Sequence, residues 1–245
     1  MSNSTQTILL SGGTSGIGYQ LLDQLHGRGH HLVVVARNEN RLAQLAAQYE
    51  RITSYACDLS SRSQIESLAT KISERHPDIS MLINNAGVQY TPGFLDDDFS
   101  FDSIEYEMTV NFLSHVWLTA LLLPSLLQQN NHAAIVNISS GLAFAPKTRS
   151  AIYCASKAAI HSFSQSLRYQ LAATPVRVQE VILPLVDTPM TQGRGSNKIS
   201  AEWAATQIIR GIERQRPEIY IGKAKLLPLL MRISPSTVKK IMRKY

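Results

Sequence analysis

Apolar runs alternate with helix-like segments along nearly the whole chain of 245 residues, and this alternation constrains the fold more than any other feature. Several runs contain almost no polar residue, which is typical of strands covered on both faces. Alternating strands and helices form right-handed βαβ units in a parallel sheet. The sequence therefore predicts an α/β fold, a doubly wound parallel β-sheet of about seven strands with helices on both faces.

The expected strands and helices have the following bounds. Strands are predicted at 7–11, 31–36, 52–56, 80–87, 133–140, 176–183 and 218–222. Helices are predicted at 16–28, 39–49, 61–76, 101–129, 150–173 and 201–214. No repeat or linker interrupts them, so a single domain at 1–245 is expected, with a basic C-terminal extension at about 223–245.

Composition and charge exclude several classes of protein. The longest apolar segment, residues 117–127, is too short to cross a bilayer and contains Pro124, so a buried helix is expected there. Residues 203–245 contain ten Lys or Arg and two Asp or Glu, a formal +8, so the rest of the +6 chain sums to −2. A nucleic-acid-binding protein would spread basic residues over its domain, so no nucleic-acid partner is expected.

The N-terminus and the cysteines bear on the compartment. The first ten residues have no basic stretch and only three consecutive apolar residues, so no signal peptide is expected. Cys57 and Cys154 suit a reducing compartment and lack metal-ligand spacing. We therefore expect a cytoplasmic protein without a metal site.

A glycine-rich stretch, "LLSGGTSGIG" (residues 9–18), follows the first expected strand and opens the first expected helix. Gly12, Gly16 and Gly18 let the backbone turn tightly and approach a ligand. The N–H groups and positive dipole end of the helix can then bind a pyrophosphate. The spacing is G-x-x-x-G-x-G, and a tight turn without a ligand is the alternative, which the strand–loop–helix context disfavours.

The end of the second strand indicates which dinucleotide is bound. Sites that prefer NAD place an acidic residue there to bind the ribose 2′-hydroxyl. Here Ala36 is followed by Arg37, and no carboxylate occurs before Glu39. Because a guanidinium suits a 2′-phosphate, NADP(H) is predicted over NAD(H), which stays possible if Arg37 is merely solvated. Asp58, after the third strand, is placed to reach the adenine amine.

Tyr153 and Lys157 lie four residues apart at the start of a long expected helix, so their side chains share one face. The spacing alone is a weak motif, and a surface Tyr–Lys contact is the alternative. The context favours function, because the helix follows the strand that ends in Ser139 and Ser140. A nearby ammonium lowers the pKa of a tyrosine, ordinarily about 10. Tyr153 would then be a general acid in reduction and a general base in oxidation.

Six motifs together resemble those of the short-chain dehydrogenase/reductase family in order and spacing: "SGGTSGIG", "CDLS", "NNAG", "VNFLSHVWLT", "NISSG" and "YCASK". The match covers residues 7 to about 188. The resemblance implies a Rossmann fold and an NAD(P)-dependent oxidoreductase. The tail "IGKAKLLPLLMRISPS" is similar to a sub-branch often labelled DltE-like, a label that identifies no substrate.

The resemblance also implies roles for single residues. Asn111 would order a water that connects Lys157 to solvent, and Ser140, rather than Ser139, would bind the substrate oxygen. Tyr153 would transfer the proton. Lys157 would lower the pKa of Tyr153 and contact the nicotinamide ribose. The cofactor would contact Gly12, Thr14, Ser15, Gly16, Ile17, Gly18, Arg37, Asp58, Leu59, Asn85, Ala86, Gly87, Tyr153, Lys157, Pro184, Val186 and Thr188.

Two departures from the family pattern bear on the site. The usual Thr at the start of the glycine motif is Ser11, which keeps a hydroxyl. The usual P-G-x-V-x-T after the sixth strand is "LPLVDT", with Leu183 and Pro184 in place of Pro and Gly. Val186 and Thr188 still match, so nicotinamide contacts should survive, whereas the stiffer Pro184 alters the substrate side.

The substrate side is expected to have an apolar wall and a lid. Residues 187–200 are polar and glycine-containing and follow the catalytic strands, so they are a candidate lid, with an inconsequential loop as the alternative. The apolar candidates are equally suited to core packing. The substrate-binding candidates are Ser140, Leu142, Tyr153, Leu185 and Met190, with Phe144 as a further wall residue.

The C-terminal tail, residues 222–245, mixes Leu, Ile and Met with Lys and Arg. Peripheral contact with an anionic membrane is possible, but packing on the domain or on a second subunit is favoured, because Pro228 and Pro235 interrupt any long helix. The helices at 101–129 and 150–173 exceed what one side of the sheet can cover, and in the family they form a subunit interface. A homodimer or homotetramer is therefore expected.

The sequence thus predicts an NADP(H)-preferring reductase or dehydrogenase acting on a small carbonyl or secondary-alcohol substrate. Two alternatives stay open. A non-catalytic redox sensor would need the glycine loop but not the set of Asn111, Ser140, Tyr153 and Lys157. A membrane-surface reductase of a lipid or acyl substrate depends on the tail alone.

Overall fold

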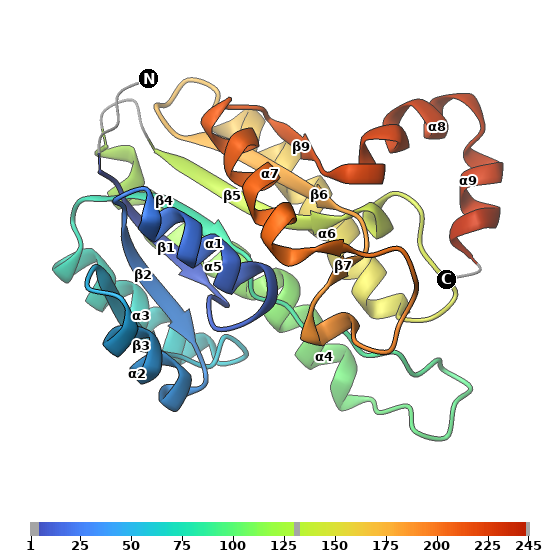
Figure 1. Ribbon diagram of the computed structural model, residues 1–245, viewed down its shortest axis with the longest axis horizontal. Coiled ribbons are helices and arrows are strands. Elements are labelled where there is room, and N and C mark those ends of the chain that lie inside the picture. The colour runs from blue at the N-terminus through green and yellow to red at the C-terminus, as the bar shows by residue number, and fades with distance from the viewer. Residues whose placement is uncertain (1–4, 130–132, 244–245) are drawn as a thin grey trace.

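The computed structural model describes residues 5–129 and 133–243, and seven parallel strands form its main sheet (Figure 1). In order across the sheet they are β3 (Ile52–Ala56), β2 (His31–Ala36), β1 (Thr7–Ser11), β4 (Ile79–Asn84), β5 (Ala134–Ser140), β6 (Arg177–Leu183) and β9 (Glu218–Tyr220). The chain winds outward in one direction from β1 and in the other from β4, so the order reverses between these two strands. The predicted doubly wound parallel sheet is confirmed.

Central strands bury both faces, because successive side chains of a strand point to opposite sides. Ile8 and Leu10 of β1 pack on one side of the sheet and Leu9 on the other, and all three are fully buried. This two-sided burial explains the nearly continuous apolar runs. The helices on the first face are α1 (Gly16–Gly27), α2 (Glu39–Gln48) and α7 (Ala201–Glu213), and those on the second are α3 (Arg62–Arg75), α5 (Ser114–Leu127) and α6 (Ala151–Gln170).

The helix predicted at 101–129 is continuous but changes its hydrogen-bonding type. It consists of α4 (Asp102–Met108), the π-helix η1 (Thr109–Leu113) and α5. This helix of 26 residues, which contains the apolar residues 117–127, is long and apolar enough to cross a bilayer by length and composition alone. Leu118, Leu122 and Leu126 are nevertheless fully buried in the core beside α3, which fits a core helix.

The segment between β6 and α7 has regular structure that the sequence did not predict. β7 (Val186–Asp187) and β8 (Ile199–Ser200) pair in parallel as a second, two-stranded sheet, and the 3-10 helix η3 (Pro189–Thr191) follows β7. Lys198 Nζ donates to Asp187 Oδ1 at 3.3 Å and to Thr191 O at 2.6 Å. The candidate lid is therefore tied together by its own contacts.

The tail folds back onto the domain as η4 (Gly222–Leu226), α8 (Leu227–Ile233) and α9 (Pro235–Met242), which Figure 1 shows in red. Leu227 and Val238 pack against Ala145, in the loop between β5 and α6. Thr148 of that loop donates from Oγ1 to the Arg243 carbonyl at 2.6 Å. The two prolines lie in the first turns of α8 and α9, where their missing N–H groups cost nothing.

Candidate active site

A cavity of about 610 Å³ lies at the carboxyl ends of the strands, where the strand order reverses. Ligands bind at this position in doubly wound sheets. Apart from the wall residue Phe144, every residue predicted above to bind the cofactor or the substrate lines this cavity, from the glycine loop after β1 to Met190 after β6. Asn111 does not line it.

The glycine loop is shaped for close approach. Gly12 has a φ of +71° and Gly16 a φ of +53°, in the left-handed region that favours glycine. A Cβ on Gly12 would lie 2.9 Å from Ala86 Cα, and a Cβ on Gly18 would lie 2.0 Å from the Gly12 carbonyl oxygen. Gly12 and Gly18 are therefore required for the packing of the loop against β4 and α1.

The N-terminus of α1 can accept an anion. Asn38, Ser61 and Ser200 cap α2, α3 and α7 through their side chains, but Ser15 makes no such bond to α1. The first N–H groups of α1 thus lack a side-chain acceptor at a helix end that attracts negative charge. These residues fit the pyrophosphate of a dinucleotide.

Ser11 and Asn85 join the glycine loop to the end of β4. Ser11 Oγ accepts hydrogen bonds from the backbone N–H groups of Asn85 at 3.0 Å and Ala86 at 3.1 Å. Asn85 Nδ2 donates to the carbonyls of Ser11 at 3.0 Å and Gly12 at 3.1 Å. The change from the family's Thr to Ser11 keeps these contacts, because only the hydroxyl is used.

Arg37 stands at the end of β2, on the rim of the cavity. Its Nη1 donates to the hydroxyl of Tyr106, and its guanidinium carbon lies 5.7 Å from that ring's centroid. Asp58 does not pair with Arg37; its Oδ1 accepts from the N–H and Oγ of Ser60 at 2.9 and 2.8 Å. No sequence motif marked Tyr106 as the partner of Arg37, because the two residues are 69 positions apart.

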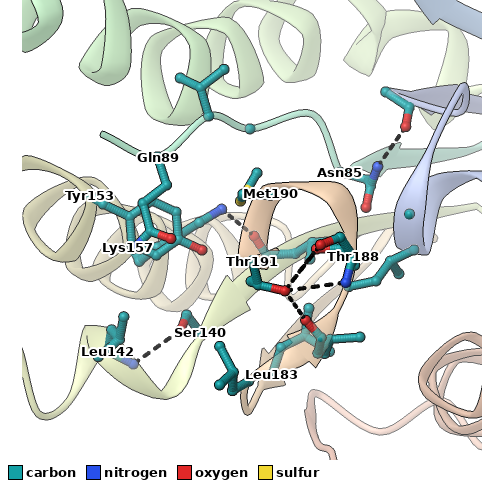
Figure 2. A pocket seen from close by; sticks show the side chains of 18 of the residues that line it. Asn85, Gln89, Ser140, Leu142, Tyr153, Lys157, Leu183, Thr188, Met190 and Thr191 are labelled. Carbon is teal, nitrogen blue, oxygen red and sulfur yellow. Dashed lines mark hydrogen bonds between the residues drawn. The ribbon is translucent and has the colours of Figure 1, made fainter. Parts of the chain in front are cut away.

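Tyr153, Lys157 and Ser140 come together inside the cavity (Figure 2). Lys157 Nζ lies 5.6 Å from the centroid of the Tyr153 ring and donates to the Ile138 carbonyl at 2.9 Å. Ser140 Oγ accepts a hydrogen bond from the Leu142 N–H at 3.2 Å and is close enough to Tyr153 to lower the pKa of its phenol. Ser139 also lines the cavity, and within the described residues its hydroxyl has no hydrogen-bond partner, so the choice of Ser140 over Ser139 stays a prediction.

The electrostatics of this group differ from the prediction. Burial raises the pKa of Tyr153, Cys154 and Glu107 raise it further, and Arg194 and Ser140 lower it. The predicted lowering by Lys157 is wrong here, because Lys157 points to Ile138 O and burial lowers its own pKa to about 8. The phenol is therefore protonated at neutral pH, the state a proton donor needs.

Asn111 lies in η1 and connects the segment after β4 to α6. Its Oδ1 accepts from the Val88 N–H at 2.7 Å, and its Nδ2 donates to the Val88 carbonyl at 2.9 Å and to Ser156 Oγ at 3.2 Å. A Cβ on Gly87 would lie 3.2 Å from Asn111 Oδ1 and 3.8 Å from Lys157 Nζ. A side chain at position 87 would therefore press against the Asn111 amide.

Glu107 is a buried acid that sequence reasoning missed. It lies one helical turn before Asn111, is 1% exposed, and accepts from the Tyr90 N–H at 3.1 Å. Burial raises its pKa to about 7, against the opposing effects of the Tyr90 hydrogen bond and Lys157. The only sequence signal was the four-residue spacing from Asn111, which places both on one helix face.

The substrate half of the cavity combines predicted and unpredicted residues. Leu142, Leu185 and Met190 line it as expected. Phe144 does not: its ring packs against His161 and Tyr220, at centroid distances of 4.4 and 6.3 Å. Lining residues that the sequence did not suggest include Gln89, Lys147, Arg194, Leu227, Ile241 and Met242. They come from loops and from the tail, which no motif relates to the site.

Comparison of the sequence places it among known oxidoreductases. The family model described as short chain dehydrogenase matches residues 6–199. The chain is 37% identical over 227 residues to the uncharacterized oxidoreductase DltE of Bacillus subtilis, covering 89% of each protein. It is 30% identical over 235 residues to the fatty acyl-CoA reductase of Acinetobacter baylyi, covering 93% of this chain and 79% of that protein.

Solved structures show the same fold. A short chain dehydrogenase from Burkholderia cenocepacia in complex with NADP matches with a TM-score of 0.88 and 25% identity over 99% of both chains. A short chain dehydrogenase/reductase from Burkholderia phymatum in complex with NAD matches with a TM-score of 0.83 and 22% identity, over 99% of this chain and 97% of that one. The fold, the motifs in their order and the family match together show that this chain belongs to the short-chain dehydrogenase/reductase family of oxidoreductases.

Proposed function

We propose that this protein is an NADP(H)-preferring oxidoreductase of carbonyl and secondary-alcohol substrates, with Tyr153 as the general acid and base. The observation that carries the proposal is the convergence of Ser140, Tyr153 and buried Lys157 in the cavity onto which the glycine loop opens. A redox sensor would have no need of this arrangement.

The chemistry follows from the positions of these side chains. When bound, a reduced nicotinamide supplies the hydride that adds to the carbonyl carbon. Tyr153 donates its phenolic proton to the carbonyl oxygen, and Ser140 holds that oxygen by a hydrogen bond. Lys157 lies beside the phenol, with its Nζ 5.6 Å from the ring centroid, and burial keeps bulk water away from the transfer.

Asn111 acts as a positioning residue in this scheme. By binding both backbone groups of Val88 and the Ser156 hydroxyl, it fixes the segment that carries Gly87 against Lys157. The water expected to connect Lys157 with solvent stays a prediction.

The preference for NADP(H) rests on Arg37. Its guanidinium is held at the end of β2 by the Tyr106 hydroxyl, where an NAD-preferring site would present a carboxylate. A 2′-phosphate would gain a charge-assisted hydrogen bond there. The two solved relatives bind NADP and NAD, so they support a nicotinamide cofactor without deciding between the two.

The test combines a Tyr153→Phe variant with a matched control, Tyr169→Phe, on the same helix with a side chain 68% exposed. NADPH-dependent reduction of a panel of aliphatic and aromatic ketones is measured, with NADPH binding followed by calorimetry. We expect Tyr153→Phe to lower kcat about 10²- to 10⁴-fold with unchanged NADPH binding, and the control to match wild type. Undiminished activity in Tyr153→Phe would contradict the proposal. Tighter binding of NADH than of NADPH would contradict the role of Arg37.

A second candidate, an acyl reductase at a membrane surface, is favoured by the exposed apolar side chains of the tail beside its basic residues. They are Leu226, Leu229, Leu230, Ile233 and Ile241. The similarity to a fatty acyl-CoA reductase points the same way. Absence of co-sedimentation with anionic liposomes at low salt would dismiss it.

Both cysteines are buried and unpaired, which suits the cytoplasmic location that we propose.

A further inference from the structure

Two partly buried cationic side chains line the cavity without belonging to the proposed catalytic group, whereas Lys223 of η4, which also lines it, is exposed. Lys147 comes from the loop between β5 and α6, and Arg194 from the segment between η3 and β8. Both are half-buried. Segments 47 residues apart thus bring two positive charges to one part of the cavity.

The two cations have no acid to neutralise them. Among the described residues neither forms an ion pair with a carboxylate, whereas neighbouring Arg149 pairs with Asp96 and Lys198 pairs with Asp187. Burial lowers the pKa of Lys147, and the Arg194 guanidinium lowers it further, so the two charges repel one another. Holding like charges together in a partly desolvated cavity is unfavourable unless an anion lies between them.

The neutral partner of Arg194 places this pair beside the reacting group. Arg194 Nη1 donates to Gln89 Oε1 at 2.9 Å. Figure 2 shows the Gln89 side chain directed toward Tyr153. Arg194 is also close enough to Tyr153 to act on the pKa of its phenol. The cations therefore lie in the part of the cavity that holds the reacting group.

We propose that Lys147 and Arg194, with Gln89, form an anion subsite that binds the carboxylate of an oxo acid or hydroxy acid whose carbonyl or hydroxyl lies at Ser140 and Tyr153. This inference rests on the proposed function and names its substrate class. Arg offers a planar fork that matches a carboxylate, and Lys adds a point charge.

The rest of this half of the cavity suits an apolar chain. Its side chains are contributed by the strand ends and by the tail: Leu142, Leu183, Leu185, Leu227, Ile241 and Met242. The substrate class is therefore an amphipathic acid, with the carboxylate at Lys147 and Arg194 and the alkyl part under α8 and α9.

The first experiment compares 2-oxohexanoate and 3-oxohexanoate with their methyl esters, using NADPH and the wild type, Lys147→Gln and Arg194→Gln. Lys225→Gln is the control, because it removes an exposed charge that does not line the cavity. We expect wild type to prefer at least one acid over its ester by roughly tenfold or more in kcat/KM. Each cavity variant should lose roughly 10- to 100-fold on that acid and stay within about twofold on the ester.

A second measurement does not depend on turnover. Hexanoate and hexanamide are titrated by calorimetry into the protein saturated with NADP⁺, and we expect hexanoate alone to bind, about tenfold more weakly in either cavity variant. Equal binding of the two probes, or hexanoate binding unchanged in both variants, would overturn the subsite. If Arg194→Gln loses affinity for NADPH while the ratio of kcat/KM for the acid to kcat/KM for the ester is unchanged, these cations bind the cofactor. That result would also overturn the anion subsite. If no carbonyl compound is reduced but hexanoate binding still depends on Lys147 and Arg194, the proposed function fails and the anion subsite stands.

Discussion

At the scale of single residues, the buried acid Glu107 makes stability depend on pH. Its pKa is raised from 4.5 to about 7, so the folded state binds a proton that the unfolded state releases. The stabilising contribution is complete below about pH 4.5 and is lost as the pH rises through about 7. The raised pKa corresponds to about 3 kcal/mol at most.

A Glu107→Gln variant tests this. Gln keeps an acceptor for the Tyr90 N–H but does not ionise, so the variant should gain stability relative to wild type between pH 5 and pH 8, by about 2–3 kcal/mol. The free energy of unfolding is measured in urea at both pH values. Burial lowers the pKa of His115 to about 3, so this histidine makes stability rise with pH over part of the same pH range. Because wild type and variant both contain His115, its effect cancels when the two proteins are compared. If the free energies of unfolding of the variant and of wild type differ by the same amount at pH 5 and at pH 8, the raised pKa of Glu107 is refuted.

Gly18 gives a second prediction at this scale. A Cβ there would lie 2.0 Å from the backbone oxygen of Gly12, so Gly18→Ala must displace the glycine loop. We expect NADPH affinity to fall by roughly 100-fold or the fold to lose several kcal/mol. Gly27→Ala, at the end of the same helix with nothing within 4 Å of its Cβ, is the control and should bind NADPH like wild type. Normal NADPH binding and stability in Gly18→Ala would contradict the packing described here.

At the scale of elements, the tail is held by a small cluster of its own. Leu227, Val238 and Ala145 are buried together, apart from the two large cores that flank the sheet. Such a satellite cluster can open without unfolding the domain. Leu227→Ala should cost about 2–3 kcal/mol locally and speed amide hydrogen exchange in residues 222–243, with unchanged exchange in β1 and β4. Leu229→Ala, in the same helix with a side chain 58% exposed, should leave exchange unaltered. Faster exchange throughout the sheet would show instead that the tail is part of the main core.

Element predictions from sequence succeeded where burial is periodic and failed where contacts are distant. The strand bounds of β1, β2 and β3 match the prediction, because a strand that is buried on both faces consists of consecutive apolar residues. The π-helix η1 and the β7–β8 pair were missed, since their short segments carry no periodic signal. The motif residues at the cavity were found, but Lys147, Arg194 and Glu107 were not. Their importance depends on neighbours from other elements, which one sequence does not reveal.

At the scale of the whole molecule, the exposed apolar side chains of the second face predict self-association. Leu121 and Leu127 of α5 are 38% and 40% exposed, and Tyr169 of α6 is 68% exposed. In solution we expect a mass two or four times 27.2 kDa by analytical ultracentrifugation. Leu121→Glu should shift the protein toward the monomer, whereas Gln48→Glu, exposed on α2 across the sheet, should not. A wild-type monomer at micromolar concentration would contradict this expectation.

The tail has a consequence for how this lineage diversifies. Leu227, Ile241 and Met242 line the cavity from outside the sheet, while the glycine loop, Tyr153 and Lys157 are fixed by strand ends and α6. Substitutions near the C-terminus can therefore reshape what the enzyme accepts and leave hydride chemistry intact. Chemistry and selectivity are encoded in separable stretches of one gene, so exchanging the last twenty-odd residues between relatives is a direct route to new substrate ranges.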